Sequence, residues 1–129
     1  MQVTPFLMFT GDAEAAIGFY RTLFADLEIL DLRRWGPGAS GKQGTIERAS
    51  FTIAGQALRC FDSAPVHEFG FTPALSLFVD CEDMAQIDAL WDGLSDGGKP
   101  LMPIGDYGFS RRFGWIEDRF GLSWQLNLP

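Results

Sequence analysis

Residues that commonly bind metals or form disulfides are scarce in this sequence. Its 129 residues include two cysteines, Cys60 and Cys81, and a single histidine, His67. Two cysteines are too few for a disulfide framework, so we expect both to be free thiols. Tight zinc and iron sites use several His, Cys or carboxylate ligands, and this sequence contains few His and Cys residues.

Basic charge and long apolar runs are also lacking. The sequence has 10 Lys and Arg against 17 Asp and Glu, a formal net charge of −7. A phosphate-backbone partner needs a basic face, so we expect no nucleic-acid partner. The apolar runs are too short to span a membrane, and the N-terminus has no signal-peptide pattern. We therefore expect a cytoplasmic protein with no membrane contact.

The sequence does have abundant phenylalanine and an internal repeat. Phe occurs 12 times, which predicts a core dominated by aromatic packing. The segment TPFLMFTGD, which starts at Thr4, recurs as TPALSLFVD from Thr72, an offset of 68 residues. A chain with two similar halves usually pairs them about a pseudo-twofold axis, with a cleft where they meet. The repeat thus indicates an architecture and a site location, but no reaction.

Hydrophobic periodicity predicts the same order of elements in both halves. In the first half we expect strands over residues 3–10, 27–35, 46–53 and 56–62, and a helix over residues 13–24 with Asp12 as its N-cap. In the second half we expect strands over residues 74–79, 99–103, 111–117 and 122–128, and a helix over residues 83–94. The prolines of residues 99–103 favour an edge strand, and the glycines of residues 36–44 favour a mobile loop.

These elements predict one domain, residues 1–129, composed of two βαβββ modules. The first module covers residues 1–62, the linker residues 63–71 and the second module residues 72–129. A single domain of this length buries roughly two thirds of the surface that its unfolded chain exposes.

Two consecutive βαβββ units resemble the vicinal oxygen chelate superfamily, which includes glyoxalase I, the extradiol dioxygenases and the bleomycin-resistance proteins. The Thr-Pro segments and the C-terminal segment GWIEDRFGLSWQL, from Gly114, look like the PhnB-like branch. This resemblance implies an α+β fold with a curved mixed sheet and a concave cleft. It also implies a homodimer whose clefts can be built from both chains.

Proteins of this branch are often labelled 3-demethylubiquinone-9 3-methyltransferase domain proteins. A Rossmann-type methyltransferase needs a parallel sheet and a Gly-rich turn that holds its cofactor, and the sequence has neither. We therefore expect that the label does not describe a reaction of this chain.

The resemblance also implies where a divalent metal would bind, because enzymes of the superfamily carry four ligands at inward-facing strand positions. In this sequence those positions fall at Pro5 or Phe6, Pro73 or Ala74, Cys60 or Asp62, and Gln125. Only Asp62 offers a carboxylate. We therefore predict no tightly held metal and no cofactor, with a weakly bound divalent metal as the alternative.

Candidate ligand-binding residues follow from strand alternation. The last strand places Ser123, Gln125 and Asn127 on one face and its apolar residues on the other, against the helices. We expect the polar face to contact a ligand through Gln125 and Ser123. Ser76 lies two residues after Ala74, one of the inward-facing positions, and so we expect it to point to the same side and to contact the ligand as well. The alternative is that Gln125 only satisfies buried backbone groups. The remaining candidates are Asp62, Met8 and the possible walls Phe51, Phe78 and Trp115, although aromatic residues at strand spacing are more often core.

Two classes of function remain open. The first is a protein that binds a small, partly aromatic or apolar molecule without a metal. The second is a lyase, isomerase or dioxygenase that uses Asp62 and a weakly held metal. We favour binding because the inward metal ligands are missing, and methyl transfer is the third possibility.

Overall fold

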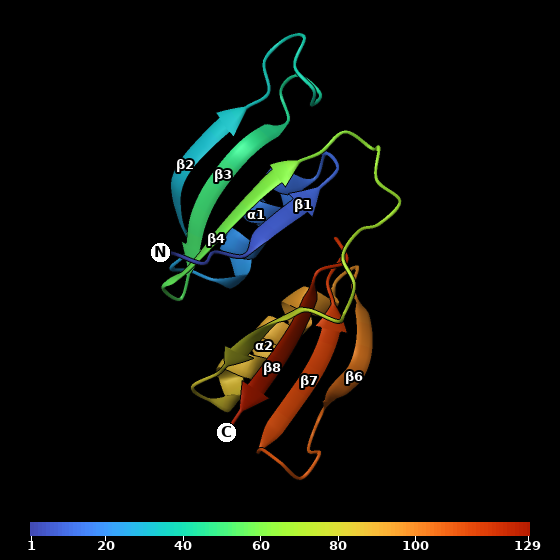
Figure 1. Cartoon of the computed structure of the whole chain (residues 1–129). Helices are drawn as coiled ribbons and strands as arrows, with labels where there is room; N and C mark the ends of the chain where they lie inside the picture. The colour runs from blue at the N-terminus through green and yellow to red at the C-terminus, as the bar shows by residue number, and fades with distance from the viewer. The chain divides into compact units, whose positions relative to one another are not determined.

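The computed structural model describes residues 1–129, which form two compact units, Met1–Gly70 and Phe71–Pro129. Each unit contains one helix and four strands in the order βαβββ (Figure 1). The predicted α+β fold of two βαβββ modules is therefore confirmed. The strands form two four-stranded mixed sheets, one in each unit. Neither helix is long and apolar enough to cross a membrane.

The first unit is a sheet with one helix against it. Its elements are β1 (Phe6–Phe9), α1 (Ala13–Leu23), β2 (Glu28–Arg34), β3 (Ile46–Ile53) and β4 (Gln56–Asp62). The strand order is β1-β4-β3-β2, in which β1 and β4 are parallel and the other pairs antiparallel. Helix α1 connects β1 to β2 and lies behind the sheet in Figure 1.

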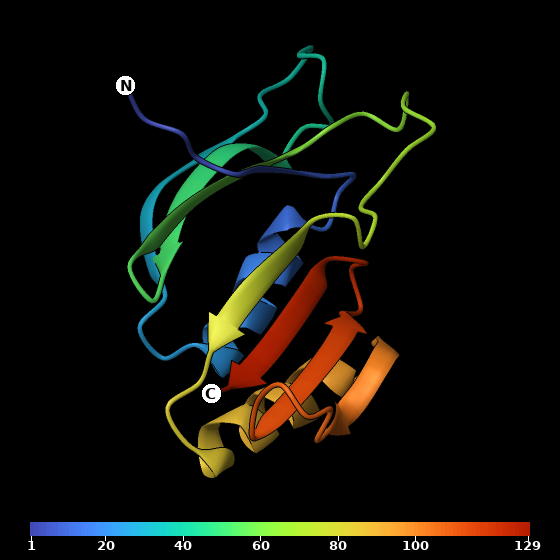
Figure 2. The same cartoon turned by 60° about the horizontal axis from the view of Figure 1, so that its bottom comes forward.

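The second unit repeats this arrangement. Its elements are β5 (Ser76–Asp80), α2 (Met84–Ser95), β6 (Lys99–Gly105), β7 (Arg112–Glu117) and β8 (Ser123–Leu128). The strand order is β5-β8-β7-β6, again with one parallel pair, β5 and β8 (Figure 2). Strand β6 is at the edge, as its prolines predict, and its register with β7 shifts twice.

Each core lies between one face of the sheet and the helix. In the second unit, Trp124, Leu126 and Leu128 of β8 are at most 1% exposed, and α2 contributes Ile87, Leu90 and Leu94. The alternation predicted for the last strand is therefore confirmed. The packing is close enough that a Cβ on Gly114 of β7 would lie 2.6 Å from the Trp91 ring of α2. The opposite face of each sheet carries no helix of its own unit.

The N-terminus of α1 is capped by a residue far away in the sequence. The Asp62 carboxylate at the end of β4 accepts hydrogen bonds from the backbone N–H groups of Gly11 (2.8 Å) and Ala13 (3.0 Å) through Oδ1. Its Oδ2 accepts from the N–H of Ile46 at the start of β3 (2.9 Å). Asp12 occupies the N-cap position but makes no side-chain capping bond, so the expected cap was wrong in this respect. In α2 the N-cap Asp83 does accept from its own helix, at the N–H of Gln86.

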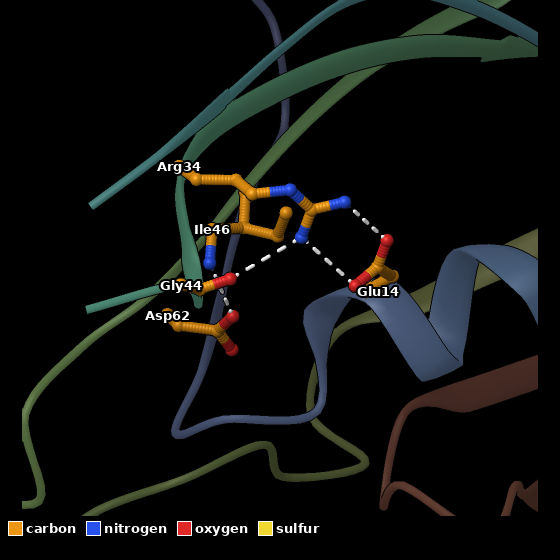
Figure 3. Close-up of polar contacts among 5 residues, drawn as sticks. All are labelled: Glu14, Arg34, Gly44, Ile46 and Asp62. Atoms are coloured by element: carbon orange, nitrogen blue, oxygen red, sulfur yellow. Dashed lines mark hydrogen bonds and ion pairs between the residues drawn. The ribbon is translucent and has the colours of Figure 1, made fainter. Parts of the chain in front are cut away.

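Hydrogen bonds hold both ends of the loop that follows β2. Arg34 donates to both oxygens of Glu14 on α1 and to the carbonyl of Gly44 (Figure 3). The hydrogen bond from Arg34 lowers the pKa of the Glu14 carboxyl. Trp35 donates through Nε1 to the carbonyl of Asp62 (2.9 Å), and its ring lies on Gly41, where a Cβ would be 2.1 Å away. The loop of residues 36–44, which we predicted to be mobile, is therefore flanked by residues that form hydrogen bonds to β4 and α1.

Replacing Asp62 with Ala should destabilise the first unit strongly. The substitution leaves three backbone N–H groups without their acceptor, which we expect to lower the free energy of unfolding by about 3 kcal/mol. Urea unfolding followed by circular dichroism measures this loss. Asp12→Ala is the matched control and should change stability little, since Asp12 makes no capping bond. Equal losses in the two variants would contradict the assignment of the cap to Asp62.

Candidate functional site

The candidate site lies on the face of the second sheet that points away from α2, which we call the open face of the second unit. Gln125 of β8 is at its centre. Gln125 lies opposite Phe78 on β5 and opposite Trp115 on β7, and directly opposed residues share a face. The amide of Gln125 is therefore flanked by an aromatic residue on each side.

A chain of hydrogen bonds crosses three strands of this face. Gln125 donates through Nε2 to Ser76 Oγ on β5 (3.2 Å), and the Ser76 and Ser123 hydroxyls are 2.7 Å apart. Trp115 on β7 donates through Nε1 to Ser123 Oγ (2.8 Å). Ser123 is fully buried, while the other three residues are partly exposed. The chain holds the Gln125 amide and the Trp115 ring in fixed orientations.

This chain leaves hydrogen-bonding capacity unused. The two serine hydroxyls carry two hydrogens, and the bond between them uses only one. Gln125 makes one hydrogen bond, through Nε2, so its carbonyl oxygen and its second amide hydrogen are available. The partly exposed end of the chain can thus accept from, and donate to, a bound molecule.

An aromatic cluster adjoins the polar chain. Phe113 of β7 is its centre, with ring centroids 6.4 Å from Phe78, 6.1 Å from Tyr107 and 5.0 Å from Phe109. Tyr107 and Phe109 come from the loop between β6 and β7, which lies in front of β7 in Figure 2. Their side chains are 41% and 64% exposed, and Phe78 is 55% exposed. Apolar ring surface therefore faces outward beside the Gln125 amide.

The structure brings together five of the eight candidates from the sequence: Ser76, Phe78, Trp115, Ser123 and Gln125. Met8 lies in the first unit on β1, beside Phe61 in the register and partly exposed.

Phe51 and Asp62 are in the core of the first unit instead of on an open face. Phe51 is 1% exposed because its position on β3 points toward the helix side of the sheet. Asp62 is 2% exposed, and both of its carboxylate oxygens accept backbone hydrogen bonds. Both side chains are therefore buried and lie apart from the five residues around Gln125.

Sequence reasoning missed three aromatic residues of the cluster: Tyr107, Phe109 and Phe113. A signal for Phe113 was present, because it has the same strand parity as Trp115. Tyr107 and Phe109 lie in a loop, where no periodicity indicates which way a side chain points.

The residues at the implied metal positions do not fit a divalent metal. Gln125 offers a neutral amide on the open face, whereas Cys60 and Asp62 are buried in the core of the first unit. Burial raises the pKa of the Cys60 thiol to about 12. Burial is also the largest cause of the rise in the pKa of the Cys81 thiol to about 11. No group of three or more His, Cys, Asp or Glu side chains is arranged to hold a metal ion.

Comparison with known proteins identifies the family. Residues 1–127 match the family model described as 3-demethylubiquinone-9 3-methyltransferase. The chain belongs to this family. Protein YjdN of Escherichia coli (strain K12) is 26% identical over 143 residues, which cover 99% of this chain and 95% of YjdN. The predicted PhnB-like membership is thus confirmed at the level of the family.

Solved structures agree with this membership. The structure described as a putative 3-demethylubiquinone-9 3-methyltransferase, PhnB protein, from Bacillus cereus is 46% identical and has a TM-score of 0.95, with 100% of both chains covered. A glyoxylase/bleomycin resistance protein/dioxygenase domain from Frankia sp. EAN1pec is 17% identical, with a TM-score of 0.69 over 99% of this chain and 96% of that chain. The latter likeness shows that this chain shares the fold of the Frankia domain.

Replacing Ser123 with Ala should break the polar chain at its buried point. Trp115 Nε1 loses its acceptor and Ser76 loses its hydroxyl neighbour, which we expect to cost about 2 kcal/mol of unfolding free energy. Urea unfolding measures the cost, and the indole N–H resonance of Trp115 should shift upfield by NMR. Ser76→Ala is the control, with a smaller cost because water can reach that partly exposed position. An unchanged Trp115 resonance in Ser123→Ala would refute the chain.

Proposed function

We propose that this chain binds a small molecule on the open face of the second unit, without a tightly held metal. The observation that carries the proposal is the Gln125 amide, which is held by Ser76, flanked by Phe78 and Trp115, and left with unused hydrogen-bonding groups. Ligand sites typically combine apolar and aromatic walls with a few fixed polar groups, and this face has both.

The chemistry of the face defines the class of ligand. Exposed rings at Phe78, Tyr107 and Phe109 favour a molecule with an aromatic or apolar part. The free carbonyl and N–H of Gln125 favour a neutral group that both donates and accepts, such as an amide or a hydroxyl. No arginine or lysine takes part in the polar chain or the aromatic cluster, so the chemistry favours an uncharged ligand.

The methyl transfer in the family's name is not part of this proposal. Each sheet has one parallel strand pair and two antiparallel pairs, which differs from the parallel sheet of a Rossmann-type methyltransferase. The lyase, isomerase or dioxygenase alternative needs a metal, and the positions discussed above offer it no set of ligands.

Titration with benzamide tests the proposal, because this probe combines one aromatic ring with one amide. In NMR titrations, we expect saturable shifts of the Gln125 side-chain amide and the Trp115 indole N–H. Gln125→Leu keeps a side chain of similar size but removes both hydrogen-bonding groups, and should weaken binding about tenfold.

Asn127→Ala serves as the control for this titration. Asn127 lies two residues along β8, where it donates to Asp80 (3.0 Å), and takes no part in the chain around Gln125. Its substitution should leave benzamide binding unchanged. Shifts that do not saturate, or that persist equally in Gln125→Leu, would reject the site.

We also propose that the protein is a cytoplasmic homodimer. The support is apolar surface at a sheet edge, where Phe6 of β1 is 51% exposed. Two free thiols suit a reducing compartment, and the net charge of −7 gives no reason to expect nucleic acid.

Sedimentation velocity at micromolar concentration should show a species of twice the chain mass. Phe6→Ser places a small polar residue at the exposed β1 position and should shift the equilibrium toward monomer. A protein that sediments only as a monomer at this concentration would contradict the homodimer.

A further inference from the structure

The first unit carries a separate cluster of arginines on its sheet face that points away from α1. On β3, Arg48 is exposed and is followed by the buried Ala49, so Arg48 points away from the core. Arg48 lies directly opposite Arg33 in the antiparallel pair of β2 and β3. Two cations thus face each other across adjacent strands, an arrangement that is destabilising unless something lies between them.

A third arginine lies close by on the same face. Arg59 of β4 alternates with the buried Leu58 and Cys60, and so points away from the core. It lies opposite Ser50 of β3, which in turn lies opposite Asp31 of β2. The row Asp31, Ser50 and Arg59 therefore adjoins the row Arg33 and Arg48.

None of the three arginines has a partner within the chain. The salt bridges of the structure involve Arg34, Arg112 and Arg119, and the hydrogen bonds likewise leave Arg33, Arg48 and Arg59 unused. The protein has a net charge of −7, yet these three arginines, which lie on one face, form no ion pair with an acidic residue. Each guanidinium keeps its five N–H donors available.

The arginines also border hollows. A hollow of about 370 Å³ is lined by Asp31, Leu32, Arg33 and Arg48. A second hollow of about 190 Å³ lies over the neighbouring strands, where its lining includes Thr4, Leu30, Ser50 and Arg59. Asp31 lines both hollows. The face therefore offers cationic donors beside hydroxyl and apolar side chains in a space of small-molecule size.

We propose that this face is an oxyanion-binding site in which Arg33 and Arg48 hold a phosphate or carboxylate group of a small molecule. An oxyanion between the two guanidinium groups would remove their mutual repulsion and accept charge-assisted, bidentate hydrogen bonds. Arg59, Thr4 and Ser50 contact the uncharged part of the molecule in the smaller hollow. Asp31 selects for a hydroxyl or amine next to the anionic group, because its carboxylate repels a second anion there.

The site differs in chemistry and in location from the one proposed above for the second unit. It binds an anion through arginine side chains of β2, β3 and β4, whereas the other binds an uncharged ligand through the amide of Gln125. Loss of one site should leave the other intact, so the two proposals fail independently.

Titration of the full-length protein with inorganic phosphate, and in parallel with acetate, tests the site. The probes are the side-chain Nε–Hε resonances of Arg33 and Arg48 in NMR spectra at low ionic strength. We expect saturable shifts of both resonances that weaken as sodium chloride is added, because salt screens exposed charges. Response to phosphate alone assigns a phosphate group, and response to acetate assigns a carboxylate.

Arg48→Ala should weaken this binding by about tenfold or more, since it removes one of two charge-assisted contacts. Arg21→Ala is the matched control, because Arg21 is an exposed arginine in the last turn of α1, on the other side of the sheet. The control should bind as the unmodified protein does, and so should Gln125→Leu. Shifts that do not saturate, or that Arg48→Ala and Arg21→Ala reduce equally, would overturn the proposal.

Discussion

A single helix against a four-stranded sheet is the constraint from which the rest of this structure follows. Adjacent strands lie about 4.8 Å apart and a helix with its side chains is about 10 Å wide, so one helix covers the central strands on one face of such a sheet and leaves the other face without a helix. Each unit has one helix, of 11 residues in α1 and 12 in α2. The central strands β3, β4, β7 and β8 therefore each have one set of residues in the core and a second set that the unit itself leaves uncovered.

The uncovered residues differ between the units although the backbone arrangement repeats. In the first unit they include Arg33, Arg48 and Arg59, and in the second they include Ser76, Trp115 and Gln125. The core-facing set is mainly apolar in both units, whereas the uncovered set carries cationic side chains in one unit and polar and aromatic side chains in the other.

Periodicity was sufficient to predict most of the fold from the sequence. The strands Ile46–Ile53 and Gln56–Asp62 match their predicted bounds, because alternation is regular and the turn at Ala54 and Gly55 is tight. Strand β1 begins at Phe6, later than predicted, since Pro5 has no N–H to donate to a ladder. The cap by Asp62 could not be predicted, because it depends on a contact between residues about 50 positions apart.

The candidate site was predictable to the extent that strand alternation governs it. Ser76, Ser123 and Gln125 were placed on one face by parity alone, and the structure adds the hydrogen bonds that join them. Parity alone left open whether Phe51 is a wall of the site or part of the core, and the structure gives a side chain that is 1% exposed. The loop residues Tyr107 and Phe109 follow no period, and their position depends on packing against Phe113.

The most direct test of the central claim is a crystal structure of the protein purified from cells and crystallised without added ligand. We expect electron density for a small molecule on the open face of the second unit, within hydrogen-bond distance of the Gln125 amide and between Phe78 and Trp115. Density for a bound molecule that instead avoids this face, with the Gln125 carbonyl and amide both satisfied by protein groups, would contradict it.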